Sequence, residues 1–141
     1  MTTDFTKIVS LDTLNKMSHK TLADHLGMVF TDIGPDWMTA KMPVDSRTHQ
    51  PYGLLHGGAS LALAETLGSV AAHCSIDSTK QYCVGLEINA NHLKGIRDGF
   101  VYGTARPIHR GRSTQVWEIK ITNEQKELVC ISRITMAVLS K

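Results

Sequence analysis

Hydrophobic residues recur with two different spacings along this chain, and the spacing within residues 58–74 differs from that on either side. Between residues 58 and 74 alanine and leucine predominate, proline is missing, and apolar side chains cover nearly the whole circumference of a helix. A helix that is apolar all round is expected to be buried. The pattern therefore predicts a long, buried central helix over residues 58–74.

Outside this helix hydrophobic and polar residues alternate, and Val, Ile, Thr, Trp and Tyr are frequent, which is typical of β-strands. The turn signal Gly34-Pro35-Asp36 joins the first two alternating runs into a predicted hairpin. The connections between the later runs are short, so we expect mostly antiparallel pairing. The predicted strands are residues 28–33, 37–43, 82–93, 100–109, 114–122 and 128–139.

A helical lead-in precedes the first strand. Residues 11–17 are predicted to form a short helix with Ser10 as its N-cap, and residues 20–26 a further turn or two that a glycine ends. One long helix lying against a curved antiparallel sheet is an α+β arrangement. We expect a single domain over residues 1–141, with residues 1–26 as the lead-in.

Composition narrows the classes of function. Hydrophobic residues make up 42% of the 141 residues, enough for one core, and the net charge of +2 gives no reason to expect a nucleic-acid partner. No signal-peptide pattern and no apolar run of ~18 residues is found, so we expect neither a signal peptide nor a membrane helix. Because CxxC and HExxH patterns are missing, we expect no metal site. The cysteines are odd in number and far apart, so we expect reduced thiols in a cytoplasmic protein; they are Cys74, Cys83 and Cys130.

Glu65 is the most informative residue for chemistry, because it lies within the apolar helix. Removing an ionised carboxylate from water costs several kcal/mol unless the charge is compensated. Ser69 lies four residues further on, on the same helix face, and can hydrogen-bond that carboxylate. The alternative is that Glu65, Thr66 and Ser69 form one ordinary polar stripe, and the residues alone leave both interpretations open.

The start of the helix carries a second candidate site, His56-Gly57-Gly58. Two glycines let a ligand approach the backbone closely, and the unpaired N–H groups and the helix dipole favour negative charge. Such a site suits the oxyanion that develops on a carbonyl under attack. Gln50, at the other end of the preceding loop, has both a donor and an acceptor. An ordinary loop-to-helix joint preceded by a solvated loop is the alternative.

Together these residues match a known pattern. The run QPYGLLHGGASLALAETLGS at residues 50–69 resembles the signature of the hotdog-fold acyl-CoA thioesterases. It is most similar to the subgroup that hydrolyses aromatic acyl-CoA esters, including 1,4-dihydroxy-2-naphthoyl-CoA and 4-hydroxybenzoyl-CoA thioesterases. The resemblance extends over about residues 11–139, through MPVDSRT, VGLEINANH and QVWEIKI. It implies a hotdog fold, in which a curved antiparallel sheet wraps a long central helix.

The resemblance also implies roles for individual residues. Glu65 matches the catalytic glutamate, acting as nucleophile or general base, and the backbone N–H of Gly57 matches the group that polarises the thioester carbonyl. No cofactor is implied, because coenzyme A is part of the substrate. Many relatives of the phenylacetate-degradation type carry Asn in place of Gln50, so Gln50 indicates the aromatic subgroup without fixing the substrate. The positions with implied supporting roles are Gln50, His56, Ser69 and His92.

The spacing of Gly57 and Glu65 has a consequence for assembly. Eight residues on one helix correspond to ~12 Å of rise, and the backward lean of a glutamate side chain recovers only part of it. Both groups have to lie within roughly 3 Å of adjacent reacting atoms. We therefore expect Gly57 of one subunit to serve Glu65 of another across a two-fold interface. The resemblance implies the same, in a homodimer or a dimer of dimers (a homotetramer).

A basic segment is the candidate site for the phosphates of coenzyme A, which need cations or backbone N–H groups. Residues 107–113 are expected to form a basic turn between two strands, and residues 94–97 add further charge. A solvated basic hairpin is the alternative. The proposed contacts are Arg106, His109, Arg110, Arg112 and Ser113.

Several functions stay open. The enzyme can serve quinone (menaquinone) biosynthesis, degrade aromatic acids, or remove wrong acyl groups from an acyl carrier protein as a proofreading thioesterase, since proteins of that type share the THQP-x-GLLHGGAS run. The same fold also occurs in hydratases and in non-catalytic acyl-CoA-binding modules. Hydratases favour an Asp and His pair before the helix, and Asp45 is too far from His56 to form one. A binding module would not need Glu65.

Overall fold

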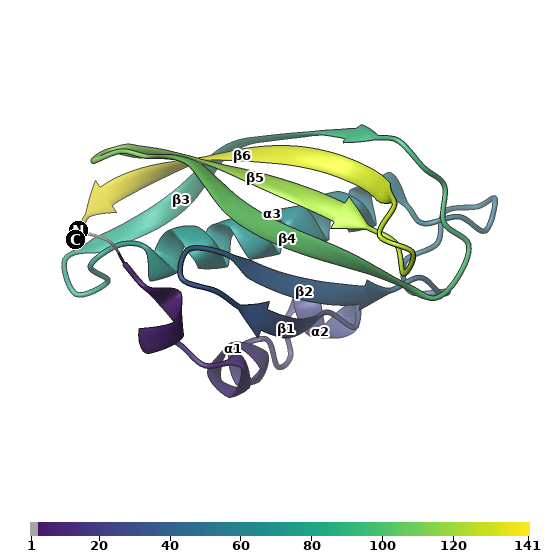
Figure 1. Ribbon diagram of the computed structural model, residues 1–141, viewed down its shortest axis with the longest axis horizontal. Coiled ribbons are helices and arrows are strands. Elements are labelled where there is room, and N and C mark those ends of the chain that lie inside the picture. The colour runs from purple at the N-terminus through teal and green to yellow at the C-terminus, as the bar shows by residue number, and fades with distance from the viewer. Residues whose placement is uncertain (1–2) are drawn as a thin grey trace.

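A six-stranded antiparallel sheet curves around one long helix, α3 (Figure 1). The computed structural model describes residues 3–141. The strands lie in the order β1-β2-β4-β5-β6-β3, and all neighbours are antiparallel. The predicted α+β class and hotdog arrangement are confirmed. The elements are β1 Val29–Ile33, β2 Met38–Pro43, α3 Gly57–Cys74, β3 Gln81–His92, β4 Phe100–Arg110, β5 Thr114–Thr122 and β6 Leu128–Ser140.

The lead-in packs beside β1 (Figure 1) and contains η1 (Phe5–Lys7), α1 (Leu11–Met17) and α2 (Leu22–His25). Ser10 is the N-cap of α1 as predicted, since its hydroxyl accepts a hydrogen bond from the Thr13 N–H at 3.1 Å. Asn15 attaches α1 to the sheet, because its amide both donates to the Phe30 carbonyl and accepts from the Phe30 N–H. The first two residues of the expected lead-in lie outside the described part of the chain.

The core lies between α3 and the concave face of the sheet. Trp117 in β5 is completely buried, and its indole N–H donates to the Gln115 side-chain oxygen at 2.8 Å. The Gln115 amide in turn donates to the Ser75 hydroxyl at 2.8 Å, which ties the end of α3 to β5. Buried polar side chains that are satisfied in this way stabilise one particular packing. The apolar side chains that α3 buries completely are Leu63, Ala64, Leu67, Ala71 and Ala72.

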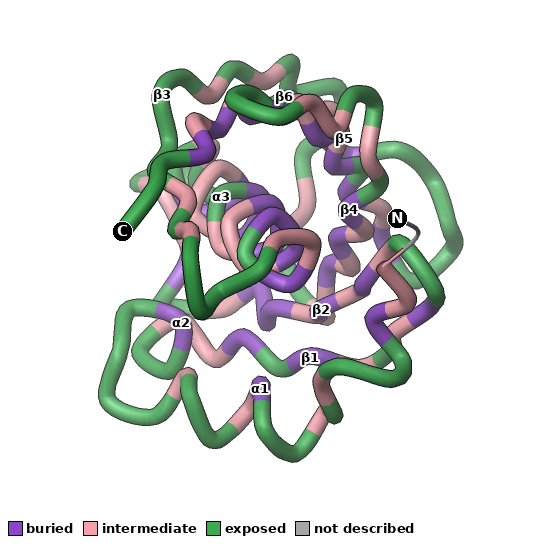
Figure 2. The backbone as a smooth tube through the Cα atoms, turned by 90° about the vertical axis from the view of Figure 1, so that its left-hand side faces the viewer, coloured by how far each residue is buried: buried purple, intermediate pink, exposed green. Residues whose placement is uncertain are grey.

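The prediction that α3 is buried all round is wrong for the single chain. Viewed along α3, the helix has one side that is not covered (Figure 2), where Glu65 and His73 are exposed and Ser69 and Val70 are half-buried. Alanine and leucine on this side gave the sequence its apolar pattern, although the sheet covers only the opposite side. No helix among residues 3–141 has the length and apolar character that a bilayer crossing needs.

The outer strand β3 lies close to the uncovered side of α3 and has a neighbouring strand along one edge only. It pairs with β6 on one side only, so its other edge leaves backbone groups free. Large apolar side chains on β3 are also exposed, and Leu86 is 61% exposed. The pairing with β6 is irregular between Gly85 and Glu87, which is a β-bulge next to α3. The uncovered side of α3 and the free edge of β3 therefore leave apolar surface without a partner in the single chain. The exposed apolar side chains of β3 are Tyr82, Val84 and Leu86.

Candidate active site

The first turn of α3 presents an unpaired backbone donor. The helix begins at Gly57, and His56 is its N-cap, with the ring Nδ1 accepting from the Gly58 N–H at 2.8 Å. Because Nδ1 accepts, the neutral ring carries its proton on Nε2 and presents a donor there. No acceptor for the Gly57 N–H occurs among residues 3–141. This N–H lies at the positive end of the helix dipole and is therefore suited to a carbonyl or an anion.

A cavity of about 350 Å³ lies beside this donor and is called the Gly57 cavity below. Gln50, Gly57 and His92 line it, so the structure brings these three predicted site residues together. The His92 ring packs against Gly57 so closely that a Cβ on Gly57 would lie 2.9 Å from Nε2. Glycine allows this close packing, because an added Cβ would displace the end of the His92 side chain. The other lining side chains are mostly apolar and include Leu54, Leu55, Leu93 and Val129.

Gln50 is oriented by its own loop. Its backbone N–H donates to the Leu54 carbonyl at 2.8 Å, and its side-chain oxygen accepts from the Tyr52 N–H. The side-chain oxygen is thus occupied, and the amide NH₂ has no acceptor among residues 3–141. Gln50 consequently offers a donor at the wall of the Gly57 cavity.

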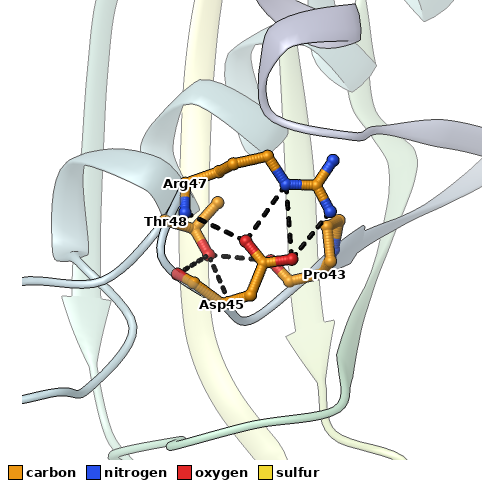
Figure 3. Close-up of polar contacts among 4 residues, drawn as sticks. All are labelled: Pro43, Asp45, Arg47 and Thr48. Carbon is orange, nitrogen blue, oxygen red and sulfur yellow. Dashed lines mark hydrogen bonds and ion pairs between the residues drawn. The ribbon is translucent and has the colours of Figure 1, made fainter.

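A compact turn before this loop holds the start of α3 in place (Figure 3). The buried Thr48 hydroxyl donates to the Pro43 carbonyl at 2.8 Å, at the end of β2, and the Asp45 carboxylate accepts from the backbone and guanidinium of Arg47. The Thr48 carbonyl accepts from the His56 N–H at 2.8 Å. This role of Thr48 was not predicted from the sequence. The signal available was the Asp-x-Arg-Thr run, typical of a turn in which an Asp side chain bonds the backbone two residues on.

Glu65 and Ser69 do not line the Gly57 cavity. Glu65 is exposed and lies over the edge strand, since a Cβ built on Gly85 of β3 would be 3.6 Å from its Oε1. Ser69 lines a separate, mainly apolar cavity of about 460 Å³ between α3 and the lead-in, together with Met17 and Val70. Within one chain the predicted site residues therefore form two groups, one at the start of α3 and one at its middle.

Arg110 and Arg112 lie at the other end of α3, whereas Lys94 of the same predicted basic set lines the Gly57 cavity. The expected basic turn also needs correction. Pro107 to Arg110 belong to strand β4, and only residues 111–113 form the turn. Arg110 and Arg112 line a cavity of about 420 Å³ beside Ser75, just after α3. Arg106 lies apart from them, with its guanidinium 5.2 Å from the centre of the Trp37 ring. The 18 residues of α3 separate this region from the Gly57 cavity within one chain. The exposed residues of the segment include His109, Arg112 and Ser113.

The three cysteines are free thiols. Burial raises the pKa of the Cys74 thiol to about 11, so it is protonated near neutral pH. Among residues 3–141, no three His, Cys, Asp or Glu side chains are grouped so that they could hold a metal ion.

Comparison with known proteins gives a consistent result. The profile of the thioesterase superfamily matches residues 52–130. The 1,4-dihydroxy-2-naphthoyl-CoA hydrolase of Escherichia coli is 49% identical over 131 residues, covering 93% of this chain and 96% of that protein. The proofreading thioesterase EntH of Cronobacter sakazakii is 50% identical over 131 residues, covering 93% and 95%.

Solved structures agree with the sequence comparisons. A mutant thioesterase from Pseudomonas aeruginosa superposes with a TM-score of 0.93 at 50% identity, covering 94% of this chain and 96% of that one. A thioesterase from Haemophilus influenzae has a TM-score of 0.91 at 46% identity, covering 94% and 92%.

The turn before α3 generates a prediction about pH. Hydrogen bonds from the Arg47 side chain and then from its backbone lower the pKa of Asp45 from 3.8 to about 2. A lowered carboxyl pKa stabilises the folded turn above the ordinary value, and this contribution is lost as the pH falls from about 4 to about 2. We expect Arg47→Ala to raise the Asp45 pKa toward its ordinary value in a carboxyl-carbon NMR titration. Asp77, whose pKa is lowered chiefly by Thr79, is the control and should not change. An unchanged Asp45 midpoint would contradict the assignment.

Proposed function

The chain belongs to the thioesterase superfamily, and from this premise we propose that it hydrolyses aromatic acyl-CoA thioesters to the free acid and coenzyme A. The observation that carries the proposal is the unpaired Gly57 N–H at the start of α3, beside a cavity that Gln50 and His92 also line. A preorganised backbone donor of this kind stabilises the oxyanion of acyl transfer. The proposed reaction requires no metal or organic cofactor.

In the proposed mechanism the thioester carbonyl oxygen accepts a hydrogen bond from the Gly57 N–H. The Gln50 amide and the His56 Nε2–H are further donors near the carbonyl oxygen and the sulfur. The Glu65 carboxylate attacks the carbonyl carbon, the C–S bond breaks, and coenzyme A leaves as a thiolate that then takes a proton from water. A second water opens the mixed anhydride and regenerates Glu65. In the alternative route Glu65 accepts a proton from a water that attacks directly, with Ser69 orienting it.

We propose that the two groups of site residues meet across a two-fold interface. Because α3 begins at Gly57, Glu65 lies ~12 Å further along the same helix and outside the Gly57 cavity. Glu65 lies over Gly85, next to the free edge of β3 and its exposed Leu86. A long apolar edge strand is a surface for pairing with another chain. A second copy on this edge would place its own Gly57 cavity toward Glu65, in a homodimer or a dimer of dimers.

The same symmetry suits the proposed coenzyme A site. A two-fold axis across α3 makes the two helices antiparallel, so the end of one helix approaches the start of the other. Arg110 and Arg112, beyond the end of α3, would then lie near the cavity of the other subunit and contact the phosphates. His109 and Ser113 are neighbouring members of the proposed contact set, whereas Arg106 is already stacked on Trp37.

Two substrate classes follow from the relatives. One relative is a 1,4-dihydroxy-2-naphthoyl-CoA hydrolase, which supports an aromatic acyl-CoA and a place in quinone biosynthesis. Another, equally similar, is a proofreading thioesterase, which supports an acyl carrier protein as the second candidate. Both classes share the thioester and differ in what carries it.

The central test is Glu65→Gln. The amide is isosteric but can neither attack the carbonyl nor accept a proton, so we expect kcat/KM to fall by roughly three orders of magnitude or more with the fold intact by circular dichroism. The assay compares naphthoyl, benzoyl and fatty acyl thioesters on coenzyme A and on a carrier protein, and aromatic CoA esters should have the highest kcat/KM in the wild type. Undiminished turnover in Glu65→Gln would refute the mechanism.

A mixing experiment tests the shared site. Gly57→Val should block the cavity, because even a Cβ there contacts His92, and Glu65→Gln removes the nucleophile. Each variant alone is expected to be inactive. When the two variants are coexpressed and pair at random, half of the dimers contain one chain of each. Each mixed dimer has one intact site out of two, so about a quarter of wild-type activity should return. If both groups served the same chain, mixing would restore nothing.

The phosphate site is tested with Arg110→Ala/Arg112→Ala. Removing two cations should raise KM for acyl-CoA by about tenfold, while an N-acetylcysteamine thioester, which has no phosphates, should keep its KM. Lys16→Ala in α1, an exposed lysine paired with Asp12, is the control for loss of surface charge. An unchanged KM for acyl-CoA would remove the basic segment from the site.

A further inference from the structure

Ser60 is a polar residue of the Gly57 cavity that neither the sequence pattern nor the proposed mechanism uses. It lies three residues after Gly57 on α3, lines the cavity, and is only 2% exposed. Its backbone N–H is bonded to the His56 carbonyl at 3.2 Å. Its hydroxyl, in contrast, has no hydrogen-bond partner among residues 3–141. Thr66 on the same helix shows the usual alternative, since its hydroxyl donates back to the Ala62 carbonyl at 2.7 Å.

The free hydroxyl of Ser60 faces the cavity. Among residues 3–141 every side-chain nitrogen or oxygen that is fully shielded from solvent has a hydrogen-bond partner. A hydroxyl without a partner must therefore keep some accessible surface. The unpaired Ser60 hydroxyl thus keeps a small accessible surface, and the cavity that Ser60 lines is the Gly57 cavity. A hydroxyl that is nearly buried and unpaired costs roughly 1–3 kcal/mol unless something in that space bonds it. The side chain therefore indicates a polar atom of the substrate.

Spacing suggests which substrate atom this is. Residues three apart on a helix face lie about 5–6 Å from each other, so Ser60 is one such step from the Gly57 N–H. In thioesters of coenzyme A, the bonds C–S, S–C, C–C and C–N join the carbonyl carbon to the first amide nitrogen of the pantetheine arm. An extended chain of these bonds spans about 5 Å. The amide would lie among Leu54, Leu93 and Val129, where its N–H needs a partner.

We propose that the Ser60 hydroxyl oxygen accepts a hydrogen bond from the first amide N–H of the pantetheine arm, while the Gly57 N–H binds the thioester carbonyl. This inference rests on the proposed function and assigns one wall of the cavity to the thiol side of the substrate. Coenzyme A and carrier proteins have the same arm, so Ser60 recognises both classes of thioester. Ser60 is thus a binding residue that selects the arm and not the acyl group.

The experiment removes the hydroxyl and the amide separately. Two benzoyl thioesters are compared, one of N-acetylcysteamine and one of 2-mercaptoethyl acetate, in which an ester oxygen replaces the N–H. Ser60→Ala should lower kcat/KM about tenfold for the amide substrate and leave the ester substrate within about twofold. Ser60→Thr, which keeps the hydroxyl, should restore the preference for the amide.

A matched control separates recognition from stability. Ser132 is also a buried serine, but its hydroxyl donates to the Asn89 carbonyl at 2.8 Å, between β6 and β3. Ser132→Ala should change kcat/KM for both substrates by the same factor. Equal loss on both substrates in Ser60→Ala, or no loss, would overturn the proposal. A loss that follows a ring hydroxyl, when 4-hydroxybenzoyl replaces benzoyl, would assign Ser60 to the acyl side and overturn it as well.

A binding measurement keeps this test independent of the proposed function. The S-phenacyl thioethers of the same two thiols cannot be hydrolysed, and their Kd is measured by calorimetry. Ser60→Ala should weaken the amide thioether about tenfold and leave the ester thioether unchanged. Hydrolysis of the thioesters by the wild-type enzyme tests the function, and the difference between the two Kd ratios tests Ser60. Failure of one therefore does not hide failure of the other.

Discussion

The hydrogen bonds that meet at His56 fix where α3 begins, and the geometry of the site depends on that start. The His56 N–H is bonded to Thr48, and its ring accepts from Gly58. If the chain entered the helix one residue out of register, another residue would take the place of Gly57, and Ser60 and Glu65 would turn by about 100° around the helix axis. The hydrogen bond from the buried Thr48 hydroxyl to the Pro43 carbonyl fixes this junction relative to the end of β2. The loop therefore fixes the start of the helix, while the sheet also contacts the site directly through His92 of β3 and Val129 of β6.

One helix serves both the core and the candidate site, which explains its unusual composition. The side that faces the sheet is filled by leucine and alanine, while the other side has Glu65 and Ser69 among half-buried apolar residues. A carboxylate on the sheet side would be desolvated without a partner. On the uncovered side it remains accessible while lying next to the edge strand. The polar groups are thus placed where the core does not exclude them.

Much of the fold could be predicted because its signals are local. Ser10 caps α1 as expected, and the strand limits agree within one residue. The structure also brings three of the predicted site residues, Gln50, Gly57 and His92, together at one cavity. The exposure of Glu65 was one of two interpretations that the sequence left open, because alanine looks the same on the sheet side and on the uncovered side of a helix. The Asp-x-Arg-Thr run indicates the turn at Thr48 but not the bond from Thr48 to Pro43. Pro107 lies in the strand that the alternation predicts over residues 100–109, and not in the basic turn that was also expected there.

The donor at Gly57 belongs to the main chain, and this affects how the protein can change by mutation. A side-chain donor is lost by many single substitutions, whereas a backbone N–H is removed only by proline. The neighbouring walls, among them Leu54 and Val129, consist of side chains that a single substitution replaces. The group proposed to bind the carbonyl is therefore hard to delete, while its surroundings are easy to alter. Such a separation allows substrate range to drift under selection without rebuilding the reaction centre.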